Sequence, residues 1–600
     1  MSKIRESYNR YRREVPAPIP LLINPADVKK EFDKHRVAVP KQLQNDFGDT
    51  EGTSSCDPKP SSSHSEEGSA KNGYSSAKKE KKTKAKKGNK EKLKRSGSNE
   101  SLNSSSTDAS NKKKKIKKPR LDSSLSSSSE RRSFGESTPA QQSSIEEGRE
   151  MLTWIIHPVS IEDFFSATWE KRPLHIAREH LKYYEALPNT EILDTMLRKN
   201  KMLFGKNVDI TSYTNGERKT MNPEGRASPM EVWDFYKKGC SVRILNPQTF
   251  NVKIWTLNSM LQEYFGCFVG ANIYLTPPGT QGFAPHYDDI EAFVLQLEGK
   301  KHWRLYSPRC EEEQLPRYSS DNLSEEDIGD PIMDVVLEAG DLLYFPRGTI
   351  HQANALKDSH SLHITISCYQ KNTWADLIEM VLPRAIEIAT AEVPELRQGL
   401  PRDFLQYLGV AHCEKKATDP RRNEFMNKLK RMMEKVFSKA PVDATADQFG
   451  KKFLNDALPP VLTKNEFRRS GLENSARMVQ GKLRNVKSLD LSTEVRLIRA
   501  NILRMVAEDR EEEDDEDEED VNVTVYHCAD NSREYHAEQL PSFQLTAEEV
   551  DAVEGLVHSY PNYTVIGNLS LDSDKERLDL ANKLWKKGLL LTSKPLEAGD

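Results

Sequence analysis

Six short β-rich runs between Val242 and Tyr369 constrain the fold of this chain more than any other feature. In order, the runs read SVRIL, ANIYLTP, AFVLQLEG, KHWRLYSP, DVVLEAGDLLYFPRG and LHITISCY. Residues that favour turns, mainly Gly, Pro, Asp and Asn, separate them. Many short strands with this punctuation are typical of a β-sandwich or a β-barrel. We therefore expect a β-barrel or sandwich as the central folded unit.

The periodicity changes after Thr373, where apolar residues recur every three or four positions. The first apolar stripe comprises Trp374, Leu377, Val381, Ala385 and Ile388, and the second comprises Phe425, Leu429, Met432 and Val436. This spacing predicts amphipathic helices, the first of them interrupted or kinked at Pro383. A helical region is therefore expected to follow the β-rich unit.

The last hundred residues suggest a third unit. The sequence predicts a helix over 492–508, a strand over 521–527, a helix after the capping box Thr546–Glu549, and a helix over 574–590 in which Gly588 favours termination. Ten consecutive acidic residues, 511–520, interrupt this unit and are too polar for a core. Helices around a small hairpin indicate a winged-helix-like module, with the acidic run looping out of the hairpin.

Charge is distributed unevenly along the 600 residues. Between Lys71 and Arg120 there are 19 Lys and Arg against 4 Asp and Glu, so the rest of the chain carries −19 to reach the overall −4. From about Gln44 to Ile145 the sequence is rich in Ser, Lys, Glu, Gly and Asn and poor in aromatic residues, which predicts disorder. Its two basic clusters favour a nuclear or nucleolar address together with non-specific phosphate contacts. The alternative is a solvated polyelectrolyte tail without such a role.

A histidine two residues before an acid is a weak signal in this chain. The pattern occurs at His64/Glu66, His286/Asp288, His412/Glu414 and His536/Glu538, and composition alone predicts about two occurrences. Only the pair at 286 and 288 enters a predicted strand, where residues two apart point to the same face. A further histidine, His351, follows the strand and turn of GDLLYFPRGTIHQ.

Lys301 strengthens the case for a site. The period of two places Lys301, Trp303 and Leu305 on one strand face, which implies an inward-pointing lysine, whereas Lys300 and Asp289 fall on the wrong face. A buried ammonium without a partner is costly and calls for an anion. Two histidines and one carboxylate are the ligand set of non-haem Fe(II) oxygenases, and the lysine suits the far carboxylate of a 2-oxo acid. A metal-free cupin barrel and a zinc hydrolase are the alternatives; the lysine argues against the hydrolase.

The stretches FAPHYDDIEAFVLQLEGKKHWRLY, GDLLYFPRGTIHQA and HSLHITISCYQKNTW closely resemble the JmjC-type ribosomal oxygenases. This family includes bifunctional lysine-specific demethylases and histidyl-hydroxylases of the nucleolus. FFSATWEKRPLHI, LRQGLPRDFLQYLG and DALPPVLT are similar to its entry segment and helical region, so the resemblance spans about Met151 to Asp600.

The resemblance implies roles for nine residues. Fe(II) would be bound by His286, Asp288 and His351, which would form the catalytic centre, and 2-oxoglutarate by Lys301 with Asn272 nearby. The substrate pocket would be lined by Arg243, Tyr274, Asn322 and Ser367. For the last four, barrel packing or loop capping is an equal alternative.

The resemblance also implies an α+β architecture of four parts. These are a disordered basic tail (1–145), a JmjC/cupin double-stranded β-helix barrel (146–373), a helical dimerisation region (374–475), and a winged-helix-like domain (476–600) with an acidic insertion at 508–520. Winged helices commonly bind nucleic acid, but the acidic run argues against direct DNA binding here.

We therefore expect a nuclear, partly nucleolar, homodimeric enzyme without a membrane segment. It would use iron and 2-oxoglutarate to hydroxylate a histidine of a ribosomal protein, to demethylate histone lysines, or both, and its basic tail could contact nucleic acid. The alternative from another class is a non-enzymatic nucleolar or chromatin adaptor with an inert cupin barrel.

Overall fold

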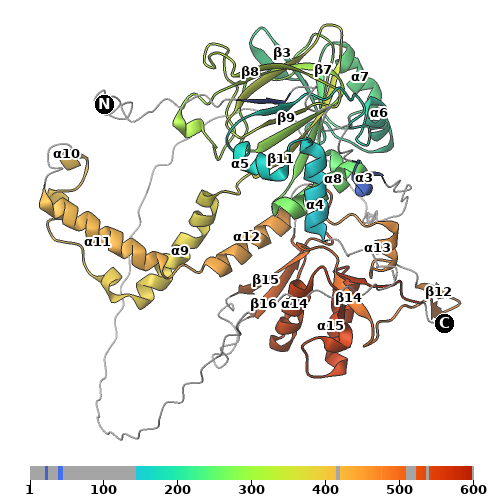
Figure 1. Ribbon diagram of the computed structural model, residues 1–600, viewed down its shortest axis with the longest axis vertical. Helices are drawn as coiled ribbons and strands as arrows, with labels where there is room; N and C mark the ends of the chain where they lie inside the picture. Colours follow the sequence, from blue (N-terminus) through green and yellow to red (C-terminus); the bar gives the residue numbers. More distant parts are fainter. Residues whose placement is uncertain are drawn as a thin grey trace, which may run out of the picture. The chain divides into compact units, whose positions relative to one another are not determined.

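The computed structural model describes residues 20–23, 38–44, 143–413, 419–473, 476–508, 522–534 and 539–597 (Figure 1). The basic clusters, most of the predicted disordered tail and the acidic run lie outside these residues.

The predicted double-stranded β-helix is confirmed as one eleven-stranded sheet with the order β1-β2-β9-β7-β11-β6-β5-β3-β4, in which β8 and β10 also pair with β7. The strands are β1 (Leu21–Ile23), β2 (Leu174–Ile176), β3 (Val208–Thr214), β4 (Glu217–Thr220), β5 (Ser241–Leu245), β6 (Gly270–Thr276), β7 (Glu291–Tyr306), β8 (Met333–Glu338), β9 (Leu342–Phe345), β10 (Ile350–Ala355) and β11 (Ser361–Cys368).

Strand β7 joins the two halves of the barrel. Its first half pairs with β9 and β11, and its second half pairs with β8 and β10. The sequence predicted two separate strands here, AFVLQLEG and KHWRLYSP, and this is wrong because the ladder continues through Gly299. That glycine has a φ of +65°, and a Cβ on it would lie 1.8 Å from the His360 carbonyl oxygen. The strand therefore continues through Gly299, where the left-handed backbone and the close approach of His360 both favour glycine.

A β-bulge in β7 shifts the alternation of its side chains. Leu362 of β11 pairs with Glu298 and His363 pairs with Gln296, so Leu297 is left without an opposite residue. Before the bulge the even-numbered Ala292 and Val294 line the barrel interior, and after it the odd-numbered positions do so. An extra residue in one strand moves every later side chain to the opposite face. The bulge thus decides which of the two adjacent lysines, 300 or 301, points inward.

Helices pack beside the sheet on the N-terminal side of the chain. They are α4 (Ser144–Ile156), α5 (Ile161–Ala167), α6 (Thr190–Lys199), α7 (Pro229–Lys237) and α8 (Val252–Phe265). Each begins at a Ser or Asn whose side chain accepts a hydrogen bond from a first-turn N–H. Their apolar faces and the outer face of β7, with Phe293 and Leu295, form the largest hydrophobic core.

The prediction of a disordered tail from residue 1 to 145 is wrong for two short segments and for its last residues. Strand β1 pairs in parallel with β2, the short helix α3 (Lys41–Gln44) places Leu43 at 0% exposure, and α4 already begins at Ser144. These segments are ordered because they add a strand and an apolar side chain to an existing surface. Neither segment has local periodicity that could signal this.

The helical region follows the barrel as expected. It consists of α9 (Trp374–Glu392), α10 (Val410–Cys413), α11 (Pro420–Phe437), α12 (Val442–Asp456) and α13 (Lys464–Arg468). Pro383 lies inside α9, which continues through it. Within the described part of the chain, no helix is long and apolar enough to span a membrane.

The C-terminal unit contains two three-stranded sheets and two helices, and the predicted winged-helix architecture is confirmed. Its elements are β14 (Glu494–Leu497), β15 (Leu503–Glu508), β16 (Asn522–His527), β17 (Ser542–Leu545), α14 (Ala547–Ser559), β18 (Thr564–Val565), α15 (Asp574–Lys586) and β19 (Leu590–Thr592), preceded by the hairpin of β12 (Arg477–Val479) and β13 (Lys482–Arg484). The capping box at Thr546 opens α14, and Gly588 follows α15 with a φ of +72°.

The helix predicted over 492–508 is wrong, because this segment forms β14 and β15. Both are held by pairing partners distant in sequence: β14 lies between β18 and β19, and β15 pairs with β16. Glu508 is paired with Asn522, so β15 and β16, which flank the acidic run in the sequence, are adjacent strands. The predicted loop of acidic residues falls outside the described residues.

Candidate metal centre and its cavity

Three side chains expected to bind a metal come together at the mouth of the barrel. His286 forms an isolated bridge with His351, the second residue of β10, and their backbones exchange two hydrogen bonds of 3.3 and 2.8 Å. Asp288 lies in the loop between this bridge and β7. The expectation that His286 and Asp288 share the face of a regular strand is therefore wrong. The bridge to His351, rather than strand alternation, brings the three side chains together.

Backbone hydrogen bonds define which nitrogen of each imidazole is free. His286 Nδ1 lies 2.9 Å from the Ala284 carbonyl oxygen, and His351 Nδ1 lies 3.1 Å from the Thr349 carbonyl oxygen. A carbonyl only accepts, so each Nδ1 carries the proton and each Nε2 presents a lone pair. Burial and the neighbouring His286 lower the pKa of His351 to about 4, which favours the neutral form that binds metals.

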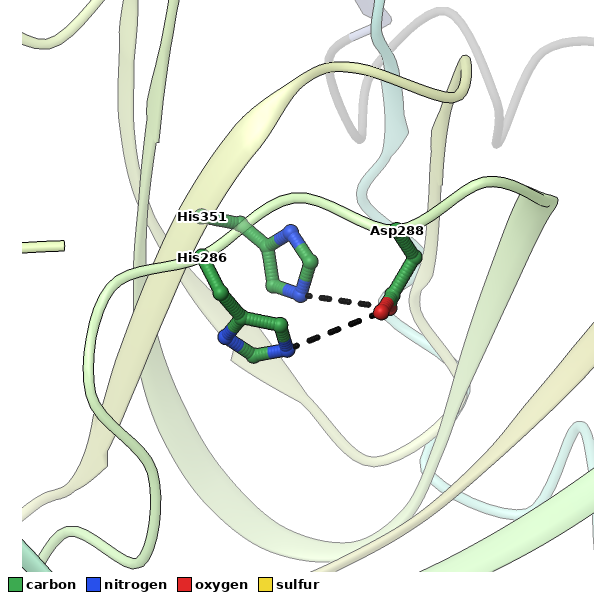
Figure 2. A group of neighbouring side chains, drawn as sticks. All are labelled: His286, Asp288 and His351. Atoms are coloured by element: carbon green, nitrogen blue, oxygen red, sulfur yellow. Dashed lines mark ion pairs between the residues drawn. The ribbon is translucent and has the colours of Figure 1, made fainter. Parts of the chain in front are cut away.

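Both free nitrogens face the carboxylate of Asp288 (Figure 2). The Nε2 atoms of His286 and His351 each lie 3.8 Å from an Asp288 oxygen, and the three ligand atoms all lie within 4.8 Å of one another. Two imidazoles and one carboxylate at this spacing fit a single divalent ion of the iron type. Among the described residues this is the one group of His, Cys, Asp and Glu side chains close enough to hold a metal.

A buried ion pair supports the loop that carries Asp288. Gly348 N–H donates to the Asp288 carbonyl at 3.0 Å, and the preceding Arg347 donates to the Glu291 carboxylate at 2.8 Å. Glu291 is 0% exposed and also accepts from the Tyr344 hydroxyl. Burial raises the pKa of Glu291 to about 7 in spite of these donors. The buried pair of Arg347 and Glu291 thus joins the turn before His351 to the start of β7, next to the loop that carries Asp288.

Lys301 lies in the same cavity, as its predicted strand face requires. It is 5% exposed, its Nζ lies 3.3 Å from Thr276 Oγ1, and its ammonium lies 5.5 Å from the centroid of the Trp303 ring. No carboxylate in the described part of the chain forms an ion pair with it. Burial lowers its pKa to about 7. An anion beside this amine would restore its charge, so the position fits the far carboxylate of a dicarboxylic cosubstrate.

Most of the other predicted site residues line this cavity of about 530 Å³. They are Arg243, Asn272, Tyr274 and Ser367. Arg243 is ion-paired to Asp209, and Tyr274 forms side-chain hydrogen bonds with both Arg243 and Asn272. Asn272 is therefore placed beside Tyr274, whereas the hydrogen bond of Lys301 goes to Thr276. The binding roles of these four residues stay predictions.

Asn322 is not brought to the cavity. It is exposed in the loop between β7 and β8, where the neighbouring Ser319 and Ser320 line the cavity instead. These serines bind Asp289 and the backbone of Tyr287 through their hydroxyls. Asn322 therefore lies outside the cavity wall, and its role in binding the substrate stays a prediction.

Sequence reasoning missed several cavity residues. They are Arg218, Phe283, Gln352 and His363. His363 is 2% exposed, and its ring stacks on Tyr274 at a centroid distance of 4.9 Å; burial, together with Lys301, lowers its pKa well below the ordinary value. It stands in the LHITISCY strand, where the period of two could have placed it inward beside Thr365 and Ser367. Arg218 carried no such signal, because it reaches the cavity from the edge strand β4.

The barrel and its ligand cluster define the class of the protein as a JmjC oxygenase. Residues 243–377 match the family model described as the JmjC domain, and residues 458–596 match the C-terminal winged helix domain of ribosomal oxygenase 1. The predicted architecture thus agrees with both matches.

Relatives that match about three quarters of the chain identify the family more narrowly. Ribosomal oxygenase 1 of Danio rerio is 49% identical over 75% of this chain and 80% of its own length, and that of Homo sapiens is 45% identical over 74% and 68%. A protein of Branchiostoma floridae, named bifunctional lysine-specific demethylase and histidyl-hydroxylase NO66, is 46% identical over 76% and 69%. The chain belongs to the ribosomal oxygenase family, as its motifs predicted.

Proposed function

We propose that this protein is an Fe(II)- and 2-oxoglutarate-dependent oxygenase that hydroxylates a histidine side chain of a ribosomal protein. One observation carries the proposal: a two-histidine, one-carboxylate cluster shares a cavity with a buried lysine that has no carboxylate partner among the described residues. A zinc hydrolase does not account for that lysine, because a zinc-bound water needs no second cation to bind an anion. Iron and a 2-oxo acid account for both features.

The residues of the chain divide the work between them. His286, Asp288 and His351 would hold the ion through three ligand atoms and leave its remaining positions open. Lys301, oriented by Thr276, would bind the far carboxylate of 2-oxoglutarate. Iron with 2-oxoglutarate and oxygen supplies the oxidising power that converts a C–H bond to C–OH. The cavity wall, including Trp303, Phe345 and Val294, would exclude water and admit one substrate side chain.

The relatives' names support histidine as the first target. Ribosomal oxygenase is the name of the relatives from Danio rerio and Homo sapiens, and histidyl-hydroxylase is part of the name of the relative from Branchiostoma floridae. Demethylation of histone lysines is the second candidate, favoured by the same Branchiostoma name. The metal ligands do not distinguish histidyl hydroxylation from lysine demethylation, because both begin with hydroxylation of a C–H bond. When that bond belongs to an N-methyl group, the product releases formaldehyde and leaves the demethylated amine.

Mass spectrometry of peptides separates the two activities. The full-length protein is incubated with iron, 2-oxoglutarate and ascorbate against ribosomal-protein peptides and methyl-lysine histone peptides, beside Asp288→Ala. A gain of one oxygen on a histidine supports the proposal, and loss of a methylene from methyl-lysine supports the second candidate. Succinate formation without change in either set of peptides would point to another substrate. Absence of succinate would contradict the oxygenase itself and favour the non-enzymatic adaptor.

We also propose that the protein acts in the nucleus, partly in the nucleolus, as a homodimer. The support is the local excess of positive charge between Lys71 and Arg120, and the helical region with exposed apolar side chains such as Trp374 and Ile378. Nucleic-acid contact through the basic tail belongs to the same proposal. A fluorescent fusion lacking residues 71–120 that still concentrates in the nucleolus would contradict the address. Light scattering that gives the mass of one chain would contradict the dimer.

A further inference from the structure

Arg218 is a cavity-lining cation that neither the metal nor the cosubstrate uses. It lies on the edge strand β4, and its guanidinium covers the ring of Phe283 with 4.4 Å between the guanidinium carbon and the ring centroid. Phe283 in turn packs against Tyr274, with centroids 5.5 Å apart, and lies 6.3 Å from the ring of His286. One aromatic ring thus connects this cation to the metal centre.

The neighbouring cation, Arg243, has a counter-charge. Arg243 approaches the same Phe283 ring at 5.4 Å, but its charge is balanced by the carboxylate of Asp209. The second oxygen of that carboxylate accepts from the Asn222 side chain at 2.8 Å. Each oxygen of Asp209 thus has a partner, Arg243 or Asn222, and no hydrogen bond or ion pair joins Asp209 to Arg218 in the described residues. Asp289, another carboxylate of the cavity wall, accepts hydrogen bonds from Ser319 and Gln370. With the ion on Asp288 and the cosubstrate on Lys301, Arg218 is a cation of the cavity wall that forms no ion pair among the described residues.

The guanidinium of Arg218 has N–H groups without an acceptor in the described part of the chain. Across the described ranges, no side-chain hydrogen bond or ion pair of Arg218 is found, and its Nε is buried without an acceptor. Burial and the neighbouring Arg243 lower its pKa below the ordinary value, yet an arginine stays protonated. A half-buried arginine with an unsatisfied N–H has lost part of its hydration without gaining an acceptor. An incoming oxygen atom would satisfy it.

We propose that Arg218 forms a specificity subsite at the cavity mouth, which binds an acceptor oxygen of the substrate segment beside the target residue. The oxygen belongs either to a carboxylate side chain or to a backbone carbonyl, since a guanidinium donates to both. The inference rests on the proposed function, because it requires a protein segment to enter this cavity. It assigns Arg218 to substrate choice and leaves the oxidative chemistry to the metal centre.

The chain contains a matched control on the same strand. Lys219 also carries one positive charge, but it is exposed, is not part of the cavity wall, and is ion-paired to Glu217 at 3.0 Å. Replacing Arg218 or Lys219 with Gln removes the same charge from adjacent positions. A difference in peptide affinity between the two variants therefore comes from a direct contact of Arg218 in the cavity. The long-range electrostatic field of the protein changes by the same charge in both.

Binding is the measurement, so that the result does not depend on turnover. Full-length protein is loaded with Mn(II) and N-oxalylglycine, a non-reacting dicarboxylate, and peptides are selected from a library randomised around a central histidine. The selected peptides are then titrated against wild type, Arg218→Gln and Lys219→Gln. We expect Arg218→Gln to weaken binding about tenfold, the usual range for a hydrogen bond to a charged group, and Lys219→Gln to change it less than about twofold.

Two arms distinguish the source of the oxygen. If it is a carboxylate, wild type enriches Asp or Glu at one fixed position, and Arg218→Glu enriches Lys or Arg there. If it is a carbonyl, no side chain is enriched, but a thioamide at one peptide bond weakens binding to wild type and leaves binding to Arg218→Gln unchanged. Should Arg218→Gln not fold, Arg218→Lys beside Lys219→Arg gives the same comparison with a smaller expected loss, about threefold.

Three outcomes would overturn the subsite. The first is equal affinity of wild type and Arg218→Gln, and the second is equal losses in Arg218→Gln and Lys219→Gln. The third is failure of wild type to bind any peptide of the library. Succinate formation by the same preparation, loaded with iron and 2-oxoglutarate, tests the proposed function separately. Active enzyme without an effect of Arg218 refutes the subsite alone, whereas no succinate refutes the catalytic assignment.

Discussion

Two buried cations in this molecule have opposite surroundings. Arg499, between β14 and β15, is 4% exposed and donates to Glu466 at 2.6 Å and to the carbonyl oxygens of Val461 and Ile498 at 2.7 Å. Lys301 in the barrel is 5% exposed and has one hydroxyl contact, at 3.3 Å. The first charge is neutralised by the protein itself. The second has been left without a counter-charge in the described residues.

The pKa values follow this difference. Burial alone would raise the pKa of Glu466, but the charge and hydrogen bonds of Arg499 outweigh it and lower the pKa to about 2, so the pair stays ionised. Burial lowers the pKa of Lys301 to about 7, and nothing opposes it. A buried charge with a full set of partners belongs to the architecture, whereas one without partners indicates a place for a ligand.

The largest expected effect is the loss of the metal centre. Asp288→Ala removes one of three ligand atoms and with it the ion that would chelate the cosubstrate, so Lys301 alone has to hold 2-oxoglutarate. We expect succinate formation to fall roughly a thousandfold, together with loss of bound iron. His302→Ala, which removes a histidine paired with Asp334 on the outer face, should retain activity. Near-normal turnover by Asp288→Ala would refute the assigned ligand set.

The second test contrasts the stability of the two buried cations. Glu466→Ala leaves Arg499 buried without its carboxylate, and we expect the free energy of unfolding to fall by about 3–5 kcal/mol. Lys301→Met replaces an unpaired ammonium with an apolar side chain of similar length, and should be neutral or stabilising within about 1 kcal/mol. Denaturant unfolding of the metal-free proteins measures both.

Glu387→Ala is the reference for this comparison, since its ion pair with Arg384 is largely exposed. It should change stability by less than about 1 kcal/mol. A loss of several kcal/mol in Lys301→Met would show that the lysine has a structural partner, and the contrast between the two cations would then fail.

The third test is the pH dependence of cosubstrate binding. The free enzyme has a Lys301 pKa of about 7, and the bound carboxylate requires the ammonium. Above pH 7 binding therefore takes up a proton, and affinity for 2-oxoglutarate should weaken as pH rises, by up to about tenfold per unit, until the higher pKa of the complex is reached. In Lys301→Arg, whose guanidinium stays charged, this slope should vanish. Calorimetry in two buffers measures the proton uptake; equal slopes in both proteins would exclude Lys301 as its source.

The smallest expected effect is at the adjacent lysine. Lys300 forms an ion pair with Glu338 at 2.7 Å, and both side chains are close to half exposed. Lys300→Met should change stability by less than about 1 kcal/mol and leave 2-oxoglutarate turnover unaltered. A large loss of 2-oxoglutarate turnover in Lys300→Met would mean that the strand presents Lys300 to the cavity.

The local sequence determines a large part of this protein. The short strands, the amphipathic helices and the capping box at Thr546 could be predicted because hydrophobic periodicity and capping act within a few residues. The long motifs around His286 and His351 identified the family, and the apolar neighbours of Lys301 predicted its inward orientation correctly. These signals are local in the chain, or are fixed by family membership.

Contacts between distant residues determine the rest. The alternation from Ala292 and Val294, continued without interruption, would have pointed Lys300 inward, and only the bulge against β11 shifts the phase to Lys301. The segment 494–508 forms strands because β16, β18 and β19 supply its hydrogen-bond partners. Arg218 reaches the cavity because β4 pairs at the edge of the sheet. Register, bulges and edge pairing depend on partners far along the chain, so no local pattern of residues encodes them.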